Sequence, residues 1–451
     1  MTAKNVLIVA GAESRGYALA WKLAKEGHNV TLTPGNGASD KVGCGTGDIS
    51  ISGMNHNHRL ADYAEAMKFD LTLVGPELPL VNGIVDEFVH RGLPIFGPTR
   101  NYARLEGSKV YSSEVMRMYG VPTPSAYAFS SYSGAKSFLK QHWRDNRRFV
   151  VKADGLHGGK GAFVENSLED ALEAVDIVFR SLGDQRVLLQ ERVTGTELSS
   201  MALVGGGFRS LASSMDYKRV GLNEFGIDPD SNTGGVGAVS PHPLDATGKL
   251  NNNEVNEISK SIVMATEMDQ RNGTYSGVLY PGLMIAPPNP VSPEAMYVLE
   301  VNVRFGDPEM GVVLKRMKSD LYPYLEAASQ HRLSEMSSIE WDPRVSVGAV
   351  IATPGYPYSN SVKKSLGKPF RGERDPCMED DLEIFYGDVE RKEGRLINSG
   401  GRVVLVVALG SDYVSARERL YAAIDEGRGI GLGDGKTHTQ FRRDIAEGLV
   451  A

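Results

Sequence analysis

Residues 150–161 read Val-Val-Lys-Ala-Asp-Gly-Leu-His-Gly-Gly-Lys-Gly, and this stretch carries the strongest local signal in the chain. A short apolar strand bearing Lys152 leads into a glycine-rich loop with a second lysine, Lys160. Its backbone N–H and ammonium groups can enclose a polyphosphate. The spacing fits neither a Walker A loop nor a dinucleotide fingerprint. Taken alone, the run also fits a hairpin with solvated lysines. The loop glycines, which allow close backbone approach, are Gly158, Gly159 and Gly161.

A second segment, residues 298–309, reads Val-Leu-Glu-Val-Asn-Val-Arg-Phe-Gly-Asp-Pro-Glu. The period of a strand puts Glu300, Asn302 and Arg304 on one face. A carboxylate beside an amide oxygen suits Mg²⁺, which usually completes its coordination with water and substrate phosphates. Such a face alone is often merely solvent-exposed. Together with the lysine loop, it favours a site for a nucleotide and magnesium.

The overall composition limits the choice of function. A chain of 451 residues predicts about two to four domains. The net charge of −7 gives no general basic footprint for nucleic acid. No apolar run approaches the ~20 residues that span a bilayer, and residues 1–10 lack signal-peptide features. Two cysteines, Cys44 and Cys377, fit a reducing compartment. We therefore expect a cytoplasmic protein with no membrane or nucleic-acid partner.

The N-terminal part alternates apolar runs with helical patterns. Each predicted strand ends in a Gly/Pro turn, which is typical of a parallel, doubly wound sheet. Ligands of such sheets bind at the carboxyl ends of the strands. Further on, residues 106–119 look helical, 149–192 mix strands and a helix, and the chain is strand-rich again from 345. The N-terminal strands are expected at 5–10, 30–33, 71–74 and 94–96.

An ordered series of motifs covers nearly the whole chain, and in it the chain resembles the ATP-grasp ligases. Within them it is similar to the phosphoribosylamine–glycine ligase (glycinamide ribonucleotide synthetase) family of purine biosynthesis. The resemblance implies a multidomain α/β and α+β fold. Its parts would be a doubly wound N-terminal domain (1–103), an ATP-grasp region (104–328, lid lobe about 124–193) and a small strand-rich C-terminal domain (329–451). The motifs are 18–23, 75–77, 95–99, 105–109, 151–155, 216–221, 232–238, 304–309, 400–403 and 443–445.

The resemblance also implies an activity. The chain would be an ATP-dependent carboxylate–amine ligase acting through an acyl phosphate. It would convert glycine, 5-phosphoribosylamine and ATP into glycinamide ribonucleotide, ADP and phosphate. ATP and Mg²⁺ would be required, with Mn²⁺ able to substitute. The partners would be small-molecule carboxylate and amine substrates, and the protein would be a monomer or a small homo-oligomer.

Matching the motifs residue by residue gives each part of the site its candidates. The phosphates of ATP would meet Lys152 and Lys160 under a lid formed by Gly158, Gly159 and Gly161. The adenine hinge and ribose carboxylate would be Gln190, Glu191, Val193 and Glu197. The metal ligands would be Glu300 and Asn302, and the catalytic residues would be Arg304, Lys160, Asp216 and Lys218. The substrates would contact Gly11, Arg15, Gly35, Asn36, Glu77, Asn232, Thr233, Gly234 and Gly235.

The first strand–helix turn departs from the family pattern. The family has a glycine-rich G-x-G-G-R-E-H run there, but residues 11–17 read Gly-Ala-Glu-Ser-Arg-Gly-Tyr. A carboxylate at Glu13 would repel a phosphate. Gln190 replaces a usual glutamate, and the loop 222–231 is longer than usual. The alternatives are a paralogue that joins glycine or a similar acid to another amine, and a non-catalytic nucleotide-binding regulator.

Overall fold

The computed structural model describes most of the chain, and the predicted residues Gly11, Gly159 and Lys160 lie outside the part that it describes. The described residues are 2–10, 13–47, 49, 56–158, 161–183, 186–221, 225–271, 273–287, 295–372, 380–424, 429–433 and 439–450.

The N-terminal sheet is parallel throughout, in the order β3-β2-β1-β4-β5, which confirms the expected doubly wound domain. The β1 side chains of residues 6–9 are fully buried, as a strand covered on both faces requires. The strands are β1 (Asn5–Val9), β2 (Asn29–Thr33), β3 (Gly45–Thr46), β4 (Leu71–Val74) and β5 (Ile95–Phe96). The helices here are α1 (Ser14–Lys25), η1 (Ser39–Val42), α2 (His56–Met67), α3 (Glu77–Val81) and α4 (Ile84–His90).

Helix α1 connects the N-terminal sheet to the rest of the molecule. Its apolar residues, such as Leu19 and Leu23, are fully buried, and Lys22 and Lys25 in the last turn suit the negative end of the helix dipole. Trp21 packs edge-on against Phe385 of the C-terminal part, with ring centroids 5.4 Å apart. The second half of α1 therefore packs against the C-terminal part.

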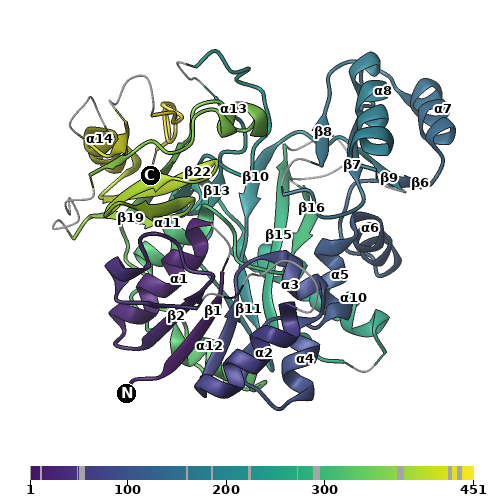
Figure 1. The fold of residues 1–451 in the computed structure, drawn as a ribbon. Helices are drawn as coiled ribbons and strands as arrows, with labels where there is room; N and C mark the ends of the chain where they lie inside the picture. Colours follow the sequence, from purple (N-terminus) through teal and green to yellow (C-terminus); the bar gives the residue numbers. More distant parts are fainter. Residues whose placement is uncertain are drawn as a thin grey trace.

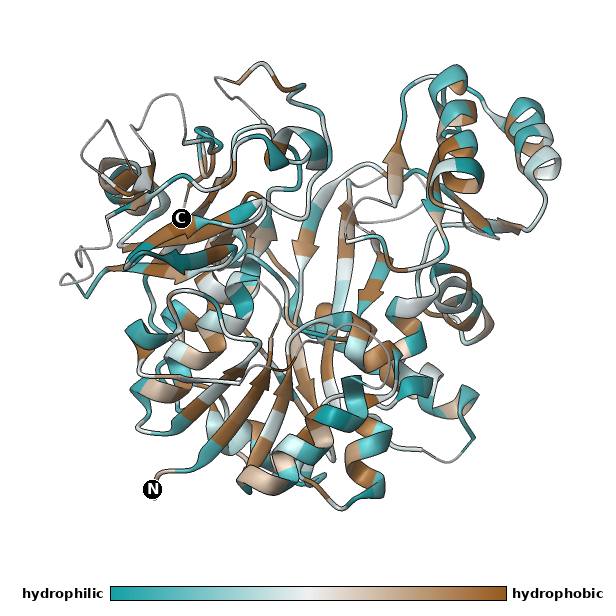
Figure 2. Cartoon of the chain, viewed as in Figure 1, coloured by the Kyte–Doolittle hydropathy of each residue, from teal (hydrophilic) through white to brown (hydrophobic). Residues whose placement is uncertain are grey.

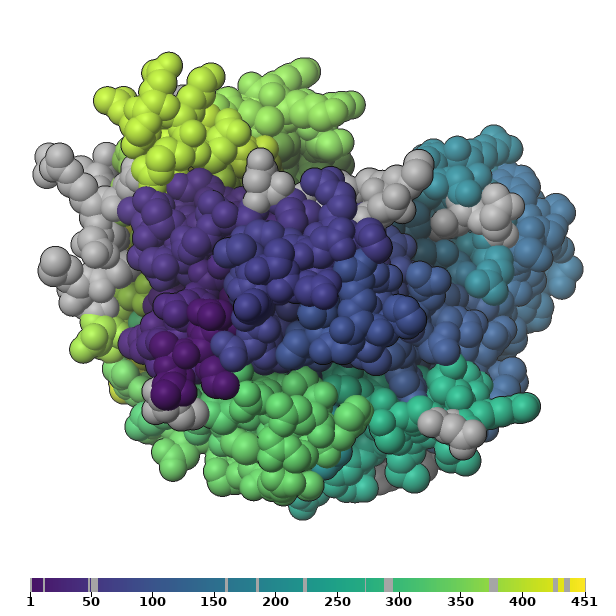
Figure 3. Space-filling model, turned by 60° about the horizontal axis from the view of Figure 1, so that its bottom comes forward, coloured from purple at the N-terminus to yellow at the C-terminus, as the bar shows by residue number. Residues whose placement is uncertain are grey.

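A separate lobe projects from the body (Figures 1 and 3). Its antiparallel sheet has the order β6-β9-β7-β8 and a core of its own that includes Phe149, Val151 and Leu189. It consists of β6 (Ala126–Phe129), α7 (Tyr132–His142), β7 (Phe149–Ala153), β8 (Ala162–Val164), α8 (Leu168–Asp176), η2 (Ile177–Ser181) and β9 (Val187–Glu191). This is the lobe expected to act as a lid.

The single helix expected over 106–119 is wrong, because the chain breaks at Ser108. Ser108 has an extended backbone, and its hydroxyl accepts a hydrogen bond from the Tyr111 N–H (3.1 Å), which makes it an N-cap. Two helices result, α5 (Arg100–Gly107) and α6 (Lys109–Met118).

Two further sheets form the body. The first has the order β10-β15-β11-β12, with β16 on the other edge of β15. The second, β13-β14-β17-β22-β19, combines strands from before and after residue 329. Hydrophobic residues concentrate on the strands and polar residues on the outer helix faces (Figure 2). The strands are β10 (Thr196–Ser199), β11 (Ala202–Val204), β12 (Phe208–Ser210), β13 (Met215–Asp216), β14 (Gly237–Ser240), β15 (Gly277–Ala286), β16 (Ala295–Asn302), β17 (Val345–Ala352), β19 (Leu382–Tyr386) and β22 (Arg402–Gly410).

The remaining elements cover these sheets. Within the described residues, no helix is long and apolar enough to cross a membrane. The helices are α9 (Pro243–Ala246), α10 (Asn252–Asp269), α11 (Glu309–Arg316), α12 (Tyr322–Ser329), η3 (Leu333–Glu335), α13 (Ser359–Lys363) and α14 (Tyr413–Ile424). Short strand pairs are β18 (Phe370–Arg371) with β23 (Gly431–Leu432), and β20 (Val389–Lys392) with β21 (Arg395–Asn398).

Candidate active site

Lys152 joins the lysine-bearing strand to the strand that carries Glu300 and Asn302. It lies on β7, its side chain is buried, and its Nζ donates a hydrogen bond to the Leu299 carbonyl of β16 (2.8 Å). Burial lowers the pKa of Lys152 to about 8, although Glu300 opposes that change. The lysine strand and the Glu-x-Asn strand, about 150 residues apart in the sequence, therefore form one site.

The glycine loop after β7 is anchored where it begins. Gly158 has a left-handed backbone (φ +56°), and a Cβ on Gly161 would lie 2.9 Å from Cδ2 of His157. Asp154 fixes the start of the loop, because its Oδ1 accepts bonds from the Ser108 hydroxyl (2.8 Å) and the Val110 N–H (3.0 Å). The loop thus begins on the N-terminus of α6.

Glu300 lies beside two other charged residues at the end of β16. Its Oε1 is 3.5 Å from Nζ of Lys218, which is also 3.6 Å from Oε2 of Glu197. Lys218 is the main cause that lowers the pKa of Glu300 to about 2. Burial disfavours the charge of Lys218, but Glu300 and Glu197 outweigh it and raise the Lys218 pKa well above its ordinary value. Three of the predicted residues therefore lie together.

The predicted alternation holds at the end of β16, after a register shift in its pairing with β15 between Val298 and Glu300. Val301 and Val303 are buried in the apolar core, whereas Asn302 between them makes polar contacts. Asn302 accepts a bond on Oδ1 from Arg304 Nη2 (3.1 Å) and donates Nδ2 to the Tyr280 carbonyl (3.5 Å).

The donor set fits a hard divalent cation. Glu300 offers carboxylate oxygens and Asn302 an amide oxygen, both suited to Mg²⁺. Across the described part of the chain, no group of three or more His, Cys, Asp or Glu side chains could hold a metal. A cation here would therefore take most of its ligands from water and a bound phosphate.

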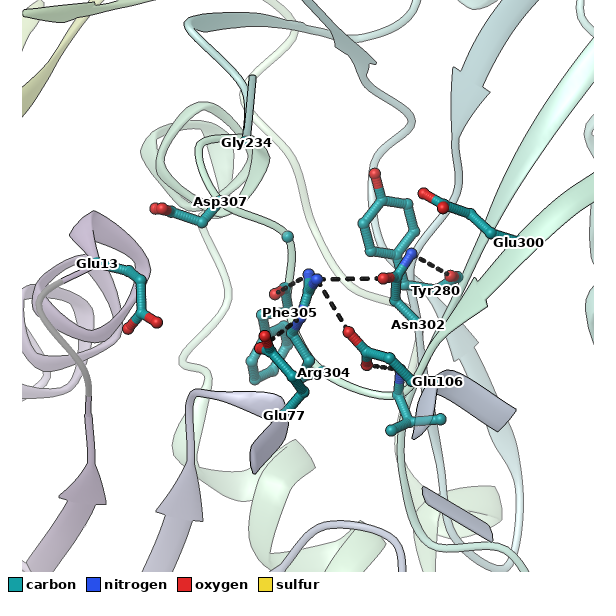
Figure 4. A network of polar contacts seen from close by, with 12 residues as sticks. Glu13, Glu77, Glu106, Gly234, Tyr280, Glu300, Asn302, Arg304, Phe305 and Asp307 are labelled. Atoms are coloured by element: carbon teal, nitrogen blue, oxygen red, sulfur yellow. Dashed lines mark hydrogen bonds and ion pairs between the residues drawn. The ribbon is translucent and has the colours of Figure 1, made fainter. Parts of the chain in front are cut away.

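Arg304 is the centre of a buried ionic network (Figure 4). Its Nη2 lies 3.0 Å from Oε1 of Glu106, its Nε lies 3.4 Å from Oε2 of Glu77, and its Nη1 donates to the Phe305 carbonyl (3.2 Å). Glu106 also accepts the Val303 N–H (2.8 Å). Burial opposes the charge of Arg304, but Glu106 and next Glu77 outweigh it and raise the Arg304 pKa. Burial also opposes the charge of Glu77, but Arg304 and Arg15 outweigh it and lower the Glu77 pKa to about 2. Glu106 was not predicted, although it lies in the quoted motif 105–109.

The first turn brings an arginine and a glutamate into the same network. Arg15 is almost fully buried, and its Nη2 lies 3.2 Å from Oε1 of Glu13 and 3.4 Å from Oε2 of Glu77. Its Nη1 donates to the Phe305 carbonyl (3.0 Å). Glu13 Oε2 is buried and accepts no bond from any described residue. The charge of Arg15 is thus already balanced by carboxylates of the protein.

Asp307 joins three regions of the chain, a connection that was not predicted from the sequence. Its Oδ1 accepts bonds from the Ser14 hydroxyl (2.5 Å) and the Arg15 N–H (3.0 Å), and its Oδ2 pairs with Arg402 Nη2 (2.7 Å). Arg402, from β22, also donates to the Gly234 carbonyl (2.6 Å). Burial would raise the pKa of Asp307, but Arg402 and Arg15 lower it. Both partners lie in motifs of the family resemblance, Asp307 in 304–309 and Arg402 in 400–403, and these motifs were the available signal for the pair.

The loop 232–235 lies over Lys218 and Asp216. Thr233 bonds the Lys218 carbonyl through both its N–H and its hydroxyl (2.8 Å each). Gly235 has φ +104°, and a Cβ there would lie 2.5 Å from Pro308 Cδ. Asp216 Oδ1 is buried and has no partner among the described residues. Burial, and next Glu309, raise the pKa of Asp216 well above its ordinary value. Asn232 pairs with Arg219 in an isolated bridge.

The other predicted residues lie at more varied places. Gln190 is buried in β9, Glu191 pairs with Arg147 (2.6 Å), and Val193 follows the strand. The Asn36 amide donates to the Tyr386 (3.0 Å) and Gly387 (3.3 Å) carbonyls, so it fixes the turn after β2, which also contains Gly35, to the C-terminal part.

Comparison with known families confirms the resemblance drawn from the motifs. Three models of phosphoribosylglycinamide synthetase match in order: the N domain over residues 4–106, the ATP-grasp (A) domain over 107–310, and the C domain over 346–448.

Comparison with individual relatives and solved structures agrees with these family matches. The phosphoribosylamine–glycine ligase of Halalkalibacterium halodurans is 37% identical, with 99% of this chain and 97% of the relative covered. The crystal structure of phosphoribosylamine–glycine ligase from Thermotoga maritima superposes with a TM-score of 0.76 at 26% identity, covering 98% of this chain and 99% of that one. The biotin carboxylase domain of Hydrogenobacter thermophilus 2-oxoglutarate carboxylase, solved with MgADP, shares the fold alone (TM-score 0.68, 15% identity, covering 97% and 91%).

Proposed function

Because the chain belongs to the phosphoribosylglycinamide synthetase family, we propose that it joins glycine to 5-phosphoribosylamine at the expense of ATP. The products are glycinamide ribonucleotide, ADP and phosphate. The observation that carries the proposal is the contact of Lys152 with β16 beside Glu300 and Asn302, since it combines a phosphate-binding cation with hard oxygen ligands.

ATP binds between the lid lobe and β16 in this proposal. Lys152 and Lys160 hold the phosphates, and the loop of Gly158, Gly159 and Gly161 covers them. Adenine lies against the hinge formed by Gln190, Glu191 and Val193. Glu197, which is about half exposed, accepts hydrogen bonds from the ribose hydroxyls.

Glu300 and Asn302 are the proposed ligands of Mg²⁺, for which Mn²⁺ could substitute. The metal would supply positive charge that neutralises the transferring phosphoryl group. Water and phosphate oxygens would complete its coordination, in keeping with the small donor set among the described residues.

The first step is phosphoryl transfer to glycine. A glycine carboxylate oxygen attacks the γ-phosphorus, the bond to the β,γ-bridging oxygen breaks, and ADP leaves with that electron pair. Arg304 and Lys218 stabilise the negative charge of the transferring phosphoryl group. The Asp216 carboxylate forms an ion pair with the glycine ammonium. The loop of Asn232, Thr233, Gly234 and Gly235 encloses the amino acid. At Gly235, close packing against Pro308 leaves no space for a side chain.

The second step forms the amide. The amine nitrogen attacks the acyl carbon, the C–O bond to phosphate breaks, and the nitrogen loses a proton. The amine approaches from the carboxyl ends of the N-terminal strands, near Gly11, Arg15, Gly35, Asn36 and Glu77. The role of Asn36 in this proposal is to hold the turn after β2 in place, because its amide is hydrogen-bonded to the C-terminal part.

One observation favours a second candidate, a ligase for a different amine. Glu13 already forms an ion pair with Arg15, so this guanidinium can bind a substrate phosphate only if the Glu13 side chain moves away. An amine without a phosphate would not require that movement.

The remaining assignments are also proposals. We divide the chain at 103 and 328, with a lid lobe over about 124–193, in keeping with the family matches and the separate core of the lobe. We place the protein in the cytosol as a monomer or small homo-oligomer, with small-molecule partners.

A coupled assay tests the proposal. ADP release is measured with ATP, Mg²⁺, glycine and freshly generated phosphoribosylamine, and the product mass is read in parallel. We expect glycinamide ribonucleotide at a turnover on the order of 1 s⁻¹ or faster. Absence of that mass, with ADP release on other amines, would establish the second candidate. ATP binding with no turnover for any acid or amine would indicate a regulator.

A further inference from the structure

The Lys218 ammonium lies between two carboxylates that we assign to different parts of ATP. It is 3.6 Å from Oε2 of Glu197, the proposed ribose ligand, and 3.5 Å from Oε1 of Glu300, the proposed metal ligand. A triphosphate that reached from the proposed ribose ligand to the proposed metal ligand would therefore pass close to this ammonium.

The side chain of Lys218 can change partners while its backbone stays fixed. Thr233 holds the Lys218 carbonyl with two hydrogen bonds of 2.8 Å. The side chain is about one-third exposed (34%), and both ion-pair distances are long for direct contact. By contrast, the Arg304–Glu106 pair is 3.0 Å apart and less exposed (18% and 8%). The Lys218 pairs are therefore the exchangeable ones.

Both proposed metal ligands carry a cation of the protein in this structure. Lys218 faces Glu300, and Arg304 donates to the Asn302 oxygen (3.1 Å). A divalent ion that approached without nucleotide would meet the like charge of Lys218 at its strongest ligand. A triphosphate offers Lys218 a partner with more negative charge than one carboxylate, which would free Glu300.

We propose that Lys218 is an internal counter-ion that keeps the metal off Glu300 until nucleotide binds, so that the divalent ion enters together with ATP. This inference rests on the nucleotide and metal site of the proposed function. It adds an order of binding: metal uptake depends on nucleotide, and Lys218 enforces that dependence.

Direct Mn²⁺ binding tests the inference without turnover. Free Mn²⁺ is measured by electron paramagnetic resonance in titrations of the whole protein, first without nucleotide and then with a non-hydrolysable ATP analogue. The variants are Lys218→Met, Lys218→Gln and Lys218→Arg. Lys260→Met is the matched control, because it removes one positive charge from an exposed pair with Glu257 on α10. Circular dichroism and the melting temperature show which variants are folded.

We expect the nucleotide-free Met and Gln variants to bind Mn²⁺ at least about tenfold more tightly than the wild type, because a like charge beside a divalent ion has been removed. The Arg variant and Lys260→Met should match the wild type, and the wild type should bind tightly only with the analogue. Unchanged Mn²⁺ affinity in the folded Met or Gln variant would overturn the inference, as would equally tight wild-type binding with and without the analogue. The ligase assay separates the two proposals: product formation with unchanged Mn²⁺ affinity removes only this inference, whereas the expected Mn²⁺ result without glycinamide ribonucleotide removes only the substrates.

Discussion

The nucleotide side and the N-terminal side of the Arg304 network differ in how tightly their lysine and arginine side chains are paired with carboxylates. On the nucleotide side, Lys218 is about one-third exposed and lies 3.5 Å from Glu300, so its pairing is loose. On the N-terminal side, Arg402 lies 2.7 Å from the buried Asp307 carboxylate, and Arg15 is closed in by Glu13 and Glu77. Exposed pairs exchange at little cost, whereas breaking a buried pair leaves an uncompensated charge. One side is therefore ready for a ligand, and the other holds three parts of the chain together.

The largest effect is expected on the nucleotide side, from Glu300→Gln. This variant loses the proposed metal ligand, and Mg²⁺-dependent ADP formation should fall about a thousandfold or more, because the metal stabilises charge in phosphoryl transfer. Steady-state kinetics with varied Mg²⁺ measures it. Glu257→Gln on the exposed face of α10 is the matched control. Turnover near that of the wild type would contradict the metal assignment.

Breaking the ion pairs of Arg304, at the centre of the network, should cost stability. Arg304→Met leaves the buried Glu106 carboxylate without its cation and leaves Glu77 with Arg15 alone, and should cost about 3 kcal/mol. Thermal unfolding should show a melting temperature lower by a few degrees for a chain of this size. The double variant Arg304→Met/Glu106→Gln should recover part of the loss. A double variant less stable than the single one would contradict the electrostatic cause.

A smaller effect is expected from Glu13, which separates the two amine candidates. Glu13→Gly removes a carboxylate that makes no side-chain cap of α1, so the helix should lose only a few tenths of a kcal/mol. If phosphoribosylamine is the substrate, its KM should fall about five- to tenfold, less than the bare Coulomb interaction allows, because Arg15 already screens Glu13. The KM values of ATP and glycine should not change.

Glu13→Gln serves as the control that keeps the size of the side chain. It should produce part of the same decrease if charge is the cause. An unchanged amine KM in both variants would mean that the turn does not face a phosphate.

The smallest effect concerns protonation of Lys152. Burial lowers the pKa of Lys152 to about 8, so the amine loses its charge as the pH rises through about 8. Because phosphates favour the charged form, nucleotide binding should take up more proton at pH 8.5 than at pH 7.0. Calorimetry in buffers of different ionisation enthalpy measures this uptake. Lys152→Met should abolish the increase with pH, and an increase that persisted in this variant would assign it to another group.

Much of the fold and part of the site could be read from the residues. The buried runs and Gly/Pro turns predicted the parallel N-terminal sheet, and the period of β16 predicted the shared face of Glu300 and Asn302. The break at Ser108 was missed because one hydroxyl cap competes with an otherwise continuous helical pattern. The adenine and lid assignments depend on the family resemblance, because no local pattern specifies them.

The sequence by itself determined which chemical groups are available: a lysine strand, a glycine loop, a carboxylate–amide strand and a carboxylate in the first turn. Only the tertiary structure decided which charges meet. Glu106 pairs with Arg304, Asp307 pairs with Arg402, and Asn36 is bonded to the C-terminal part instead of standing free. Spacing along a strand or helix fixes neighbours a few residues apart. Partners such as Asp307 and Ser14, which are 293 positions apart, are chosen by the packing of separate sheets, and no local pattern encodes that choice.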